Sequence, residues 1–248
     1  MFHFFRKKSQ LPEGPSQLFY QTDIHSHVLP GIDDGSPDID TSVRLIRGLY
    51  DLGIRKIIAT PHVISDLYRN TPQTISQALN QLKPALEQEG INIEIQTAAE
   101  YMMDDFFVKN LRSGEKLMTL RDWTVLTEQS YATPTTNLNE ICFELITAGY
   151  QPVLAHPERY LFYHNDFGIY SRLKDQGFLL QVNMLSLTGY YGKPVAKAAR
   201  FLFDHDLVDF VGTDLHHDRH LAMLRAPENQ ELFHKYISGR KMNTIFNS

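Results

Sequence analysis

The chain has 248 residues, of which 42% are hydrophobic and 21% charged, and its formal net charge is -5 at neutral pH. This composition is ordinary for a globular protein with a sizeable core, and the acidic balance disfavours nucleic acid as a partner. The single cysteine, Cys142, excludes an internal disulfide framework and fits a reducing compartment, and no apolar stretch approaches the roughly 20 residues of a membrane-spanning helix. We therefore expect a cytoplasmic protein without a transmembrane segment.

The first residues differ in composition from the rest of the chain. Residues 1–17 are expected to be an N-terminal tail that ends in a segment rich in proline and glycine, followed by a single domain over 18–248. The tail lacks an apolar core segment, so it does not have the pattern of a signal peptide. Its aromatic and basic residues offer contacts to a membrane or a partner, but a terminus that merely covers a surface groove is favoured.

Beyond the tail, short apolar runs alternate with helical patterns. The runs are often β-branched, as is typical of strands that are buried on both faces. The predicted strands cover residues 18–24, 56–59, 91–97, 123–126, 152–155, 178–182 and 208–211.

The helical patterns between these runs carry start and stop signals. Ser36 with Pro37 predicts an N-cap followed by proline at the first helical position, and Thr71 before a proline predicts a second helix start. Pro84 is expected to kink or divide this second helix. Asn137 begins a pattern that resembles a capping box.

Seven β-then-α units in series predict a parallel sheet with right-handed crossovers. At this chain length, a closed (β/α)7 TIM-like barrel is favoured over an open, doubly wound sheet. The distribution of polar residues supports the barrel. Candidate ligands follow almost every predicted strand, whereas an open sheet would gather them near one switch point.

These candidate ligands are histidines and carboxylates, the groups that Zn, Mn and Fe sites use. The His25 and His27 side chains lie two residues apart on an extended segment and can hold one ion together. Asp33 and Asp34 form a loop that is either solvated or a source of a further ligand. The remaining candidates end apolar runs: His62, Glu100, Glu128, His156, Asp214 and His216. Any one of these residues, taken alone, would more often have a structural role than a catalytic one. Nine such groups on one rim, however, can fill roughly three metal sites.

Six motifs occur in an order that makes the chain similar to a known group. They are Asp23-Ile-His-Ser-His27, Gly31-Ile-Asp-Asp-Gly35, Ala59-Thr-Pro-His62, Ala99-Glu-Tyr101, Ala155-His-Pro-Glu-Arg-Tyr160 and Thr213-Asp-Leu-His216. On these motifs, from about residue 20 to 225, the chain resembles the polymerase-and-histidinol-phosphatase (PHP) superfamily. Within it, the chain resembles the bacterial capsule and exopolysaccharide tyrosine-protein phosphatases.

The resemblance implies a distorted (β/α)7 barrel of the PHP fold with a trinuclear site at the C-terminal rim of the strands. Its metal is most often manganese, with iron or zinc as alternatives. The implied reaction is removal of phosphate from phosphotyrosine, on the tail of an autophosphorylating tyrosine kinase that controls polysaccharide synthesis. Through that kinase, the protein is expected to be peripheral to the inner membrane.

Carried over residue by residue, the resemblance implies a complete set of site residues. The metal ligands would be His25, His27, Asp34, His62, Glu100, Glu128, His156, Asp214 and His216, with Glu100 bridging two ions. Arg159 would bind phosphate, and a salt bridge to a nearby acid is its alternative role. Relatives often have asparagine after the last histidine and an arginine further on. This chain has His217, Asp218 and Arg219 there, so Arg219 is the candidate second phosphate ligand and His217 or Asp218 a candidate proton donor to the leaving group.

The implied mechanism activates water at the metals and needs no cysteine nucleophile. Cys142 is followed six positions later by Ala148, so the Cys-x5-Arg phosphate loop is absent, and a small buried hydrophobe is the better interpretation. Three alternatives remain open: a phosphatase for a small phosphomonoester such as histidinol phosphate, a phosphodiesterase or nuclease, and a non-catalytic module that binds the kinase. The acidic balance disfavours the nuclease.

Overall fold

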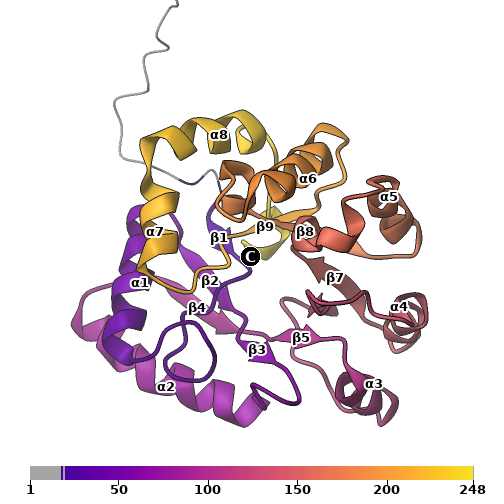
Figure 1. Ribbon diagram of the computed structural model, residues 1–248. Helices are drawn as coiled ribbons and strands as arrows, with labels where there is room; N and C mark the ends of the chain where they lie inside the picture. Colours follow the sequence, from indigo (N-terminus) through magenta and orange to yellow (C-terminus); the bar gives the residue numbers. More distant parts are fainter. Residues whose placement is uncertain (1–17, 19, 248) are drawn as a thin grey trace, which may run out of the picture.

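In the computed structural model, which describes residue 18 and residues 20–247, parallel strands surround a common centre and helices pack outside them (Figure 1). The predicted tail at 1–17 lies outside the described residues. The strands are β1 (Thr22–Asp23), β2 (Lys56–Ala59), β3 (His62–Val63), β4 (Glu94–Thr97), β5 (Glu100–Met102), β6 (Thr124–Glu128), β7 (Gln151–Ala155), β8 (Leu179–Asn183) and β9 (Phe210–Gly212).

Helices follow the strands along the chain and form the outer layer. They are α1 (Ile39–Asp51), α2 (Pro72–Gln88), α3 (Asp105–Arg112), α4 (Leu138–Thr147), α5 (Gly168–Asp175), α6 (Lys193–Asp204), α7 (Asp218–Arg225) and α8 (Pro227–Ile237). Within the described part of the chain, no helix is long and apolar enough to cross a membrane.

The strands hydrogen-bond in two parallel sheets, with the orders β1-β2-β4 and β3-β5-β6-β7-β8-β9. Two chain segments contribute to both sheets, because β2 continues into β3 and β4 into β5 after a short interruption. Across the interruption, the Ala98 N–H donates to the Ala59 carbonyl at 2.9 Å and the Glu100 N–H to the Pro61 carbonyl at 3.1 Å. The described strands therefore occupy seven positions around the ring, as predicted for a distorted (β/α)7 barrel.

Contacts between β1 and the end of β9 close this ring. The His27 N–H donates to the Leu215 carbonyl at 2.9 Å, and the buried Asp23 carboxylate accepts from the Thr213 N–H and hydroxyl at 3.0 and 2.5 Å. Gly212 permits the close approach, because a Cβ atom there would lie 2.6 Å from the Cβ of His25. An open sheet is thus excluded, and the barrel prediction is confirmed.

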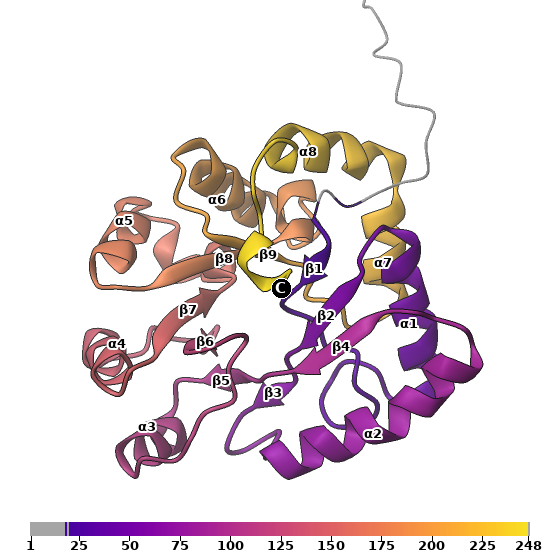
Figure 2. The same ribbon diagram turned by 180° about the vertical axis from the view of Figure 1, so that it is seen from behind.

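The barrel separates two hydrophobic cores. A small interior core includes Ile24, Ile58, Leu126 and Val153, while the larger core lies between the strands and the outer helices. The C-terminal segment lies at the barrel centre in Figure 2, and its Phe246 joins the interior core. Its neighbour Asn243 donates to the carbonyls of Thr22 and Val211 and accepts from the Val211 N–H, which ties this segment to β1 and β9.

Several element boundaries differ from the prediction. The first helix begins after Asp38, whose side chain accepts from the Thr41 N–H, and not after Ser36. Ser36 instead pairs with a residue earlier in the chain. Its N–H donates to the His27 carbonyl at 3.0 Å, and Pro37 remains in the loop. Asn137 precedes α4 without making a side-chain capping bond, so the predicted capping box is wrong.

The second helix is confirmed at its start, where Thr71 and Thr74 form a capping box, but Pro84 does not divide it. Leu82 and Leu86 on either side of the proline are buried, and their packing keeps the helix on the core. The strand prediction is correct for 56–59 and too long at 18–24, where only Thr22–Asp23 pairs with β2.

The closing contact generates a stability prediction. We expect Thr213→Val to lower the free energy of unfolding by about 1–3 kcal/mol, because the buried Asp23 carboxylate loses a hydroxyl donor while the side-chain shape is kept. Urea unfolding measures this change, with Thr213→Ser as the matched control that retains the hydroxyl. Equal stability of the valine variant and the wild type would contradict the assigned role of the hydroxyl.

Candidate metal centre

The nine predicted ligands lie together at the C-terminal ends of the strands. Within the described residues, four overlapping groups place their ligand atoms within 4.8 Å of one another, and these groups contain all nine side chains. The groups are His27–Asp34–His62–His216, His25–His27–Glu100, His25–His156–Asp214 and His62–Glu100–Glu128. Glu100 belongs to two of them, which is the position that a bridging carboxylate needs.

Strand register and local backbone conformation bring these residues together. His62 on β3 is the register partner of Glu100 on β5, and Glu128 ends β6 opposite Met102. His156 and Asp214 follow β7 and β9 with φ values of 36° and 50°, a left-handed conformation that non-glycine residues rarely adopt. Such strain persists where the surrounding structure imposes it, and here it turns both side chains toward the cluster.

Three histidines present Nε2 to the cluster because Nδ1 is engaged elsewhere. The His27 Nδ1–H donates to the Asp33 carboxylate at 2.8 Å, and the His216 Nδ1–H donates to the Asp214 carbonyl at 2.9 Å. The His25 Nδ1–H donates to the Gln181 side-chain oxygen at 2.7 Å. Since the partner oxygens can only accept, the neutral form of each ring keeps on Nε2 the free lone pair that a metal requires.

The orientation of His25 is fixed by a directional chain of hydrogen bonds. Asp214 Oδ2 accepts from the Asn183 amide at 2.7 Å, and Asn183 Oδ1 accepts from the Gln181 amide at 2.9 Å. A carboxylate can only accept, so the Asn183 amide must turn its NH2 group toward Asp214 and its oxygen toward Gln181. The Gln181 amide then turns its NH2 group toward Asn183, which leaves its Oε1 as the acceptor for His25. Asp214 Oδ1 remains directed at the cluster, 3.4 Å from the Nε2 atoms of His25 and His27.

His62, Glu100 and Glu128 provide a test of fit for a metal ion. His62 Nδ1 lies 2.9 Å from Glu128 Oε1 and 3.2 Å from Glu100 Oε2. None of these three buried atoms has a hydrogen-bond partner of suitable geometry. Burying polar atoms without hydrogen bonds costs free energy, and a cation bound among them would remove that cost. The residues present therefore fit a metal of the kind that imidazole and carboxylate prefer.

The pKa values show how strongly these groups interact. Burial and the neighbouring Glu100 raise the pKa of Glu128 to about 7, while His25 and His62 overcome burial and hold the pKa of Glu100 well below its ordinary value. Burial opposes charge on His62, yet the Glu100 carboxylate raises its pKa to about 9. Burial lowers the pKa of His156 to about 4. A bound cation would replace the protons on Glu128 and His62.

A pocket of about 260 Å³ opens over the cluster and has Arg159 in its wall. The Arg159 guanidinium lies between two tyrosine rings, 4.8 Å from the centre of Tyr131 and 4.2 Å from that of Tyr191. It also donates to Asp214 Oδ2 at 2.7 Å, so the salt bridge that the sequence left open is present. Because a guanidinium has five N–H donors, this bond leaves others for a phosphate, and that role remains a prediction.

The other predicted catalytic residues lie at the edge of the pocket or outside it. His217 lines the pocket and is exposed, and its Nδ1 caps α7 by accepting from the His220 N–H. Asp218 forms an exposed, two-pronged ion pair with Arg44, with both distances 2.9 Å. Arg219 is not among the pocket-lining residues and lies over the Tyr190 ring at 5.2 Å. Its role in phosphate binding stays a prediction.

Sequence reasoning missed the side chains that orient the ligands. Asp33 had been grouped with its loop, yet it accepts from His27, from the His62 N–H and from the Gly35 N–H. Gln181 and Asn183 had been assigned no role. The sequence did contain an indication of this role, because two amide side chains two residues apart in an otherwise apolar strand must point to the same face of the sheet.

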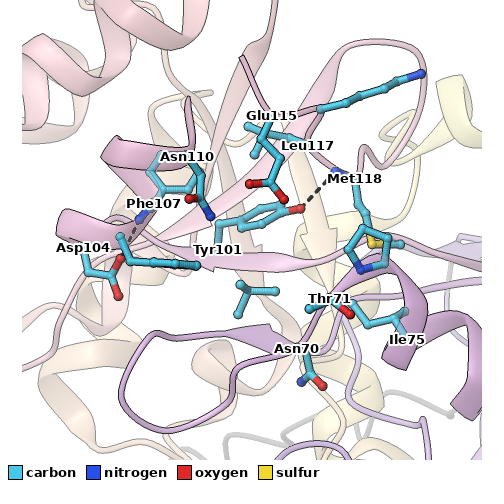
Figure 3. Close-up of a pocket in the computed structure, with 14 residues that line it drawn as sticks. Asn70, Thr71, Ile75, Tyr101, Asp104, Phe107, Asn110, Glu115, Leu117 and Met118 are labelled. Atoms are coloured by element: carbon cyan, nitrogen blue, oxygen red, sulfur yellow. Dashed lines mark hydrogen bonds between the residues drawn. The ribbon is translucent and has the colours of Figure 1, made fainter. Parts of the chain in front are cut away.

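Two other features do not belong to this centre. A smaller hollow of about 70 Å³ between α2 and α3, drawn in Figure 3, is lined by residues such as Ile75 and Tyr101 and by none of the predicted ligands. Tyr101 is held there by accepting from the Met118 N–H at 3.0 Å. Cys142 is buried in α4, and burial raises its pKa to about 11, so its thiol is protonated and unreactive at neutral pH.

The fold and the cluster together define an α/β-barrel protein with a candidate multinuclear metal centre. Within this class, residues 21–247 match the model of the family described as "Capsular polysaccharide synthesis, CpsB/CapC", and the chain belongs to this family.

Named relatives agree with this assignment. The chain is 31% identical over 195 residues to the tyrosine-protein phosphatase YwqE of Bacillus subtilis (strain 168), a match that covers 78% of this chain and 76% of the relative. It is 28% identical over 200 residues to the tyrosine-protein phosphatase CpsB of Streptococcus pneumoniae, with 78% and 82% covered. Crystal structures of YwqE and CpsB from these organisms are described as those of unique metal-dependent tyrosine phosphatases. One chain among them matches this protein with a TM-score of 0.79 and 28% identity, and the match covers 89% of both chains.

The orientation of His27 generates a prediction about metal affinity. We expect Asp33→Asn to weaken metal binding about 10- to 100-fold, because all three contacts to this carboxylate come from N–H donors and an amide NH2 would oppose at least one of them. Metal content after dialysis against defined free metal measures the effect. Asp40→Asn, at an exposed position on α1, makes the same charge change and should retain wild-type affinity. Unchanged affinity in Asp33→Asn would refute this role.

Proposed function

We propose that this protein is a metal-dependent protein-tyrosine phosphatase. The observation that carries the proposal is the convergence of five histidines and four carboxylates at the base of a pocket whose wall holds Arg159. The names of its relatives support phosphotyrosine as the substrate. The physiological substrate is the phosphorylated tail of an autophosphorylating tyrosine kinase in capsule or exopolysaccharide synthesis, a proposal supported by the family description.

The metal ions would be held by His25, His27, Asp34, His62, Glu100, Glu128, His156, Asp214 and His216. When bound, they supply charge neutralisation of the phosphoryl group and activation of water for its hydrolysis. We infer manganese as the metal, with iron or zinc also suited to this mixture of ligands. The protein acts in the cytoplasm and reaches the inner membrane through its kinase partner.

The protein's own side chains bind and orient the phosphate. The Arg159 guanidinium, fixed by Asp214 and the two tyrosine rings, directs its remaining N–H donors into the pocket toward negatively charged phosphate oxygens. His217 lies at the pocket wall with one ring nitrogen available for proton transfer to the leaving group. A phenol has a pKa of about 10, so it leaves with less protonation than an alkyl alcohol requires.

The alternatives explain less of what the chain contains. A phosphodiesterase or nuclease has no support in a chain with a net charge of -5. A non-catalytic kinase-binding module would not need nine convergent ligands around a pocket. A small-molecule phosphatase acting on histidinol phosphate uses the same type of chemistry, and the substrate comparison below separates it from the proposal.

The first test concerns metal and substrate. The purified protein should carry two or three Mn, Fe or Zn ions per chain by elemental analysis, and chelation should abolish its activity. With manganese restored, it should hydrolyse a phosphotyrosine peptide much faster than a matched phosphoserine peptide or histidinol phosphate, because the phenolate leaves more readily. Equal rates on the two peptides, or a preference for histidinol phosphate, would overturn the proposed substrate class.

Two variants control this experiment. His27→Ala should lower metal content and turnover together, since one ion loses an anchoring imidazole. Cys142→Ser should retain nearly full activity, because the thiol is buried in α4 away from the pocket. An inactive serine variant that still folds and binds metal would contradict hydrolysis without a cysteine nucleophile.

A further prediction concerns Arg159. Arg159→Ala should cost about 2–4 kcal/mol of transition-state stabilisation, measured from kcat/KM, because a charged donor to the phosphoryl oxygens is lost. Metal content should remain unchanged, since Asn183 still holds the same Asp214 oxygen. Arg159→Lys should recover little activity, because an ammonium cannot reproduce a two-pronged contact. Normal kinetics with reduced thermal stability would instead assign Arg159 to the salt bridge alone.

A further inference from the structure

Tyr131 is an exposed aromatic residue at the mouth of the metal pocket. It lies in the loop between β6 and α4, three residues after Glu128, and it lines the same pocket as Arg159. Its ring centre lies 5.6 Å from that of His156 and 5.5 Å from that of Tyr160. Even with these neighbours, Tyr131 is 46% exposed. Almost half of the surface of Tyr131 is therefore open to solvent beside the candidate metal centre.

The loop holds this ring in a defined place. Gln129 is buried and anchors the loop through three hydrogen bonds: its N–H donates to the Tyr160 hydroxyl at 2.9 Å, its side-chain amide donates to the Tyr163 hydroxyl at 2.7 Å, and its side-chain oxygen accepts from the Thr135 N–H at 3.1 Å. Tyr131 follows this anchor by two residues. A preorganised ring loses little conformational freedom when a ligand stacks on it.

The two tyrosines that flank Arg159 differ in what they offer a ligand. Tyr191 lies closer to the guanidinium, and its hydroxyl is buried, so it supports the arginine from the protein side. The Tyr131 hydroxyl lies 3.3 Å from both ring nitrogens of His156, and the residue remains 46% exposed. With its oxygens bound at Arg159 and at the metal ions that the cluster would hold, a phosphate would extend its ester group toward the open part of the pocket, which Tyr131 lines.

From this geometry, and resting on the proposed phosphatase function, we propose that Tyr131 is a specificity residue that stacks on the aromatic ring of an aryl phosphate. Aromatic pairs prefer offset or edge-to-face arrangements and add stabilisation beyond the area they bury. An alkyl phosphate such as phosphoserine has no ring to place there. The contact therefore favours phosphotyrosine through binding, in addition to the advantage of its better leaving group.

Binding of unreactive phosphonates to the manganese-loaded full chain tests this role without turnover. Isothermal titration should compare phenylphosphonate, which has the ring, with methylphosphonate, which lacks it. In Tyr131→Leu, we expect phenylphosphonate affinity to fall about 5- to 20-fold and methylphosphonate affinity to stay within about twofold. Tyr131→Phe keeps the ring and removes the hydroxyl, which lies 3.3 Å from both ring nitrogens of His156, so the ratio of the two affinities should stay as in the wild type. In peptide hydrolysis, the leucine variant should show its defect mainly in KM.

Tyr50→Leu is the matched control, because Tyr50 also carries an arginine over its ring, Arg55 at 4.3 Å, but lies on α1 outside the pocket lining. It should leave both affinities unchanged. Equal weakening of the two phosphonates in Tyr131→Leu would show that the residue acts through Arg159 or the metals, and would overturn the inference. Unchanged phenylphosphonate affinity would also overturn it while leaving the phosphatase proposal intact. A metal-loaded wild type that neither binds phosphonates nor hydrolyses phenyl phosphate would remove the proposed function itself, and this inference with it.

Discussion

The burial of Glu100 and Glu128 among four imidazoles is the constraint on which the rest of the architecture depends. Adjacent carboxylates away from water repel one another, and their charge must be balanced by protons or cations. Neighbouring histidines supply part of that balance to Glu100, while Glu128 resists ionisation. The C-terminal end of the barrel therefore requires positive charge, from protons or bound cations, between these carboxylates. The backbone strain at His156 and Asp214 is consistent with this demand, because both residues adopt a costly conformation that directs a ligand inward.

The protein orients its two paired histidines by different chemical means. His27 donates to a carboxylate, Asp33, whereas His25 donates to a neutral amide, Gln181. A carboxylate partner increases the basicity of the opposite ring nitrogen more than an amide does, so His27 is the stronger electron donor of the pair. The amide chain has a separate effect, because it connects Asp214 to His25 and makes the orientation of one ligand depend on the other.

Much of this centre was accessible from the sequence for a simple geometric reason. Parallel strands end on the same rim of a barrel, so a histidine or carboxylate after each apolar run must converge with the others. β2 was predicted with its observed bounds, since its four residues are all buried. Strands β3 and β5 were not predicted, because two or three residues are too few to show a periodic pattern.

What the sequence could not show depended on contacts between distant segments. Ser36 had the composition of a helix cap, but its pairing with the His27 carbonyl moved the helix start to Asp38. The role of Asp33 likewise required knowing which histidine lies beside it. Nor could a spacing pattern reveal that Tyr131 and Tyr191 both place their rings against Arg159, since the three residues come from segments far apart in the sequence.

The seam between β1 and β9 also bears on how the protein is made. Asp23 and Thr213 are 190 positions apart, so during synthesis all of the intervening chain must be made before these residues can meet. Contacts of such long range form late and slowly, because a large loop must first be closed. His25 and Asp214 lie on opposite sides of this seam and belong to one ligand group. A nascent chain therefore cannot assemble that group before Asp214 has been synthesised, and acquisition of metal there must follow that step.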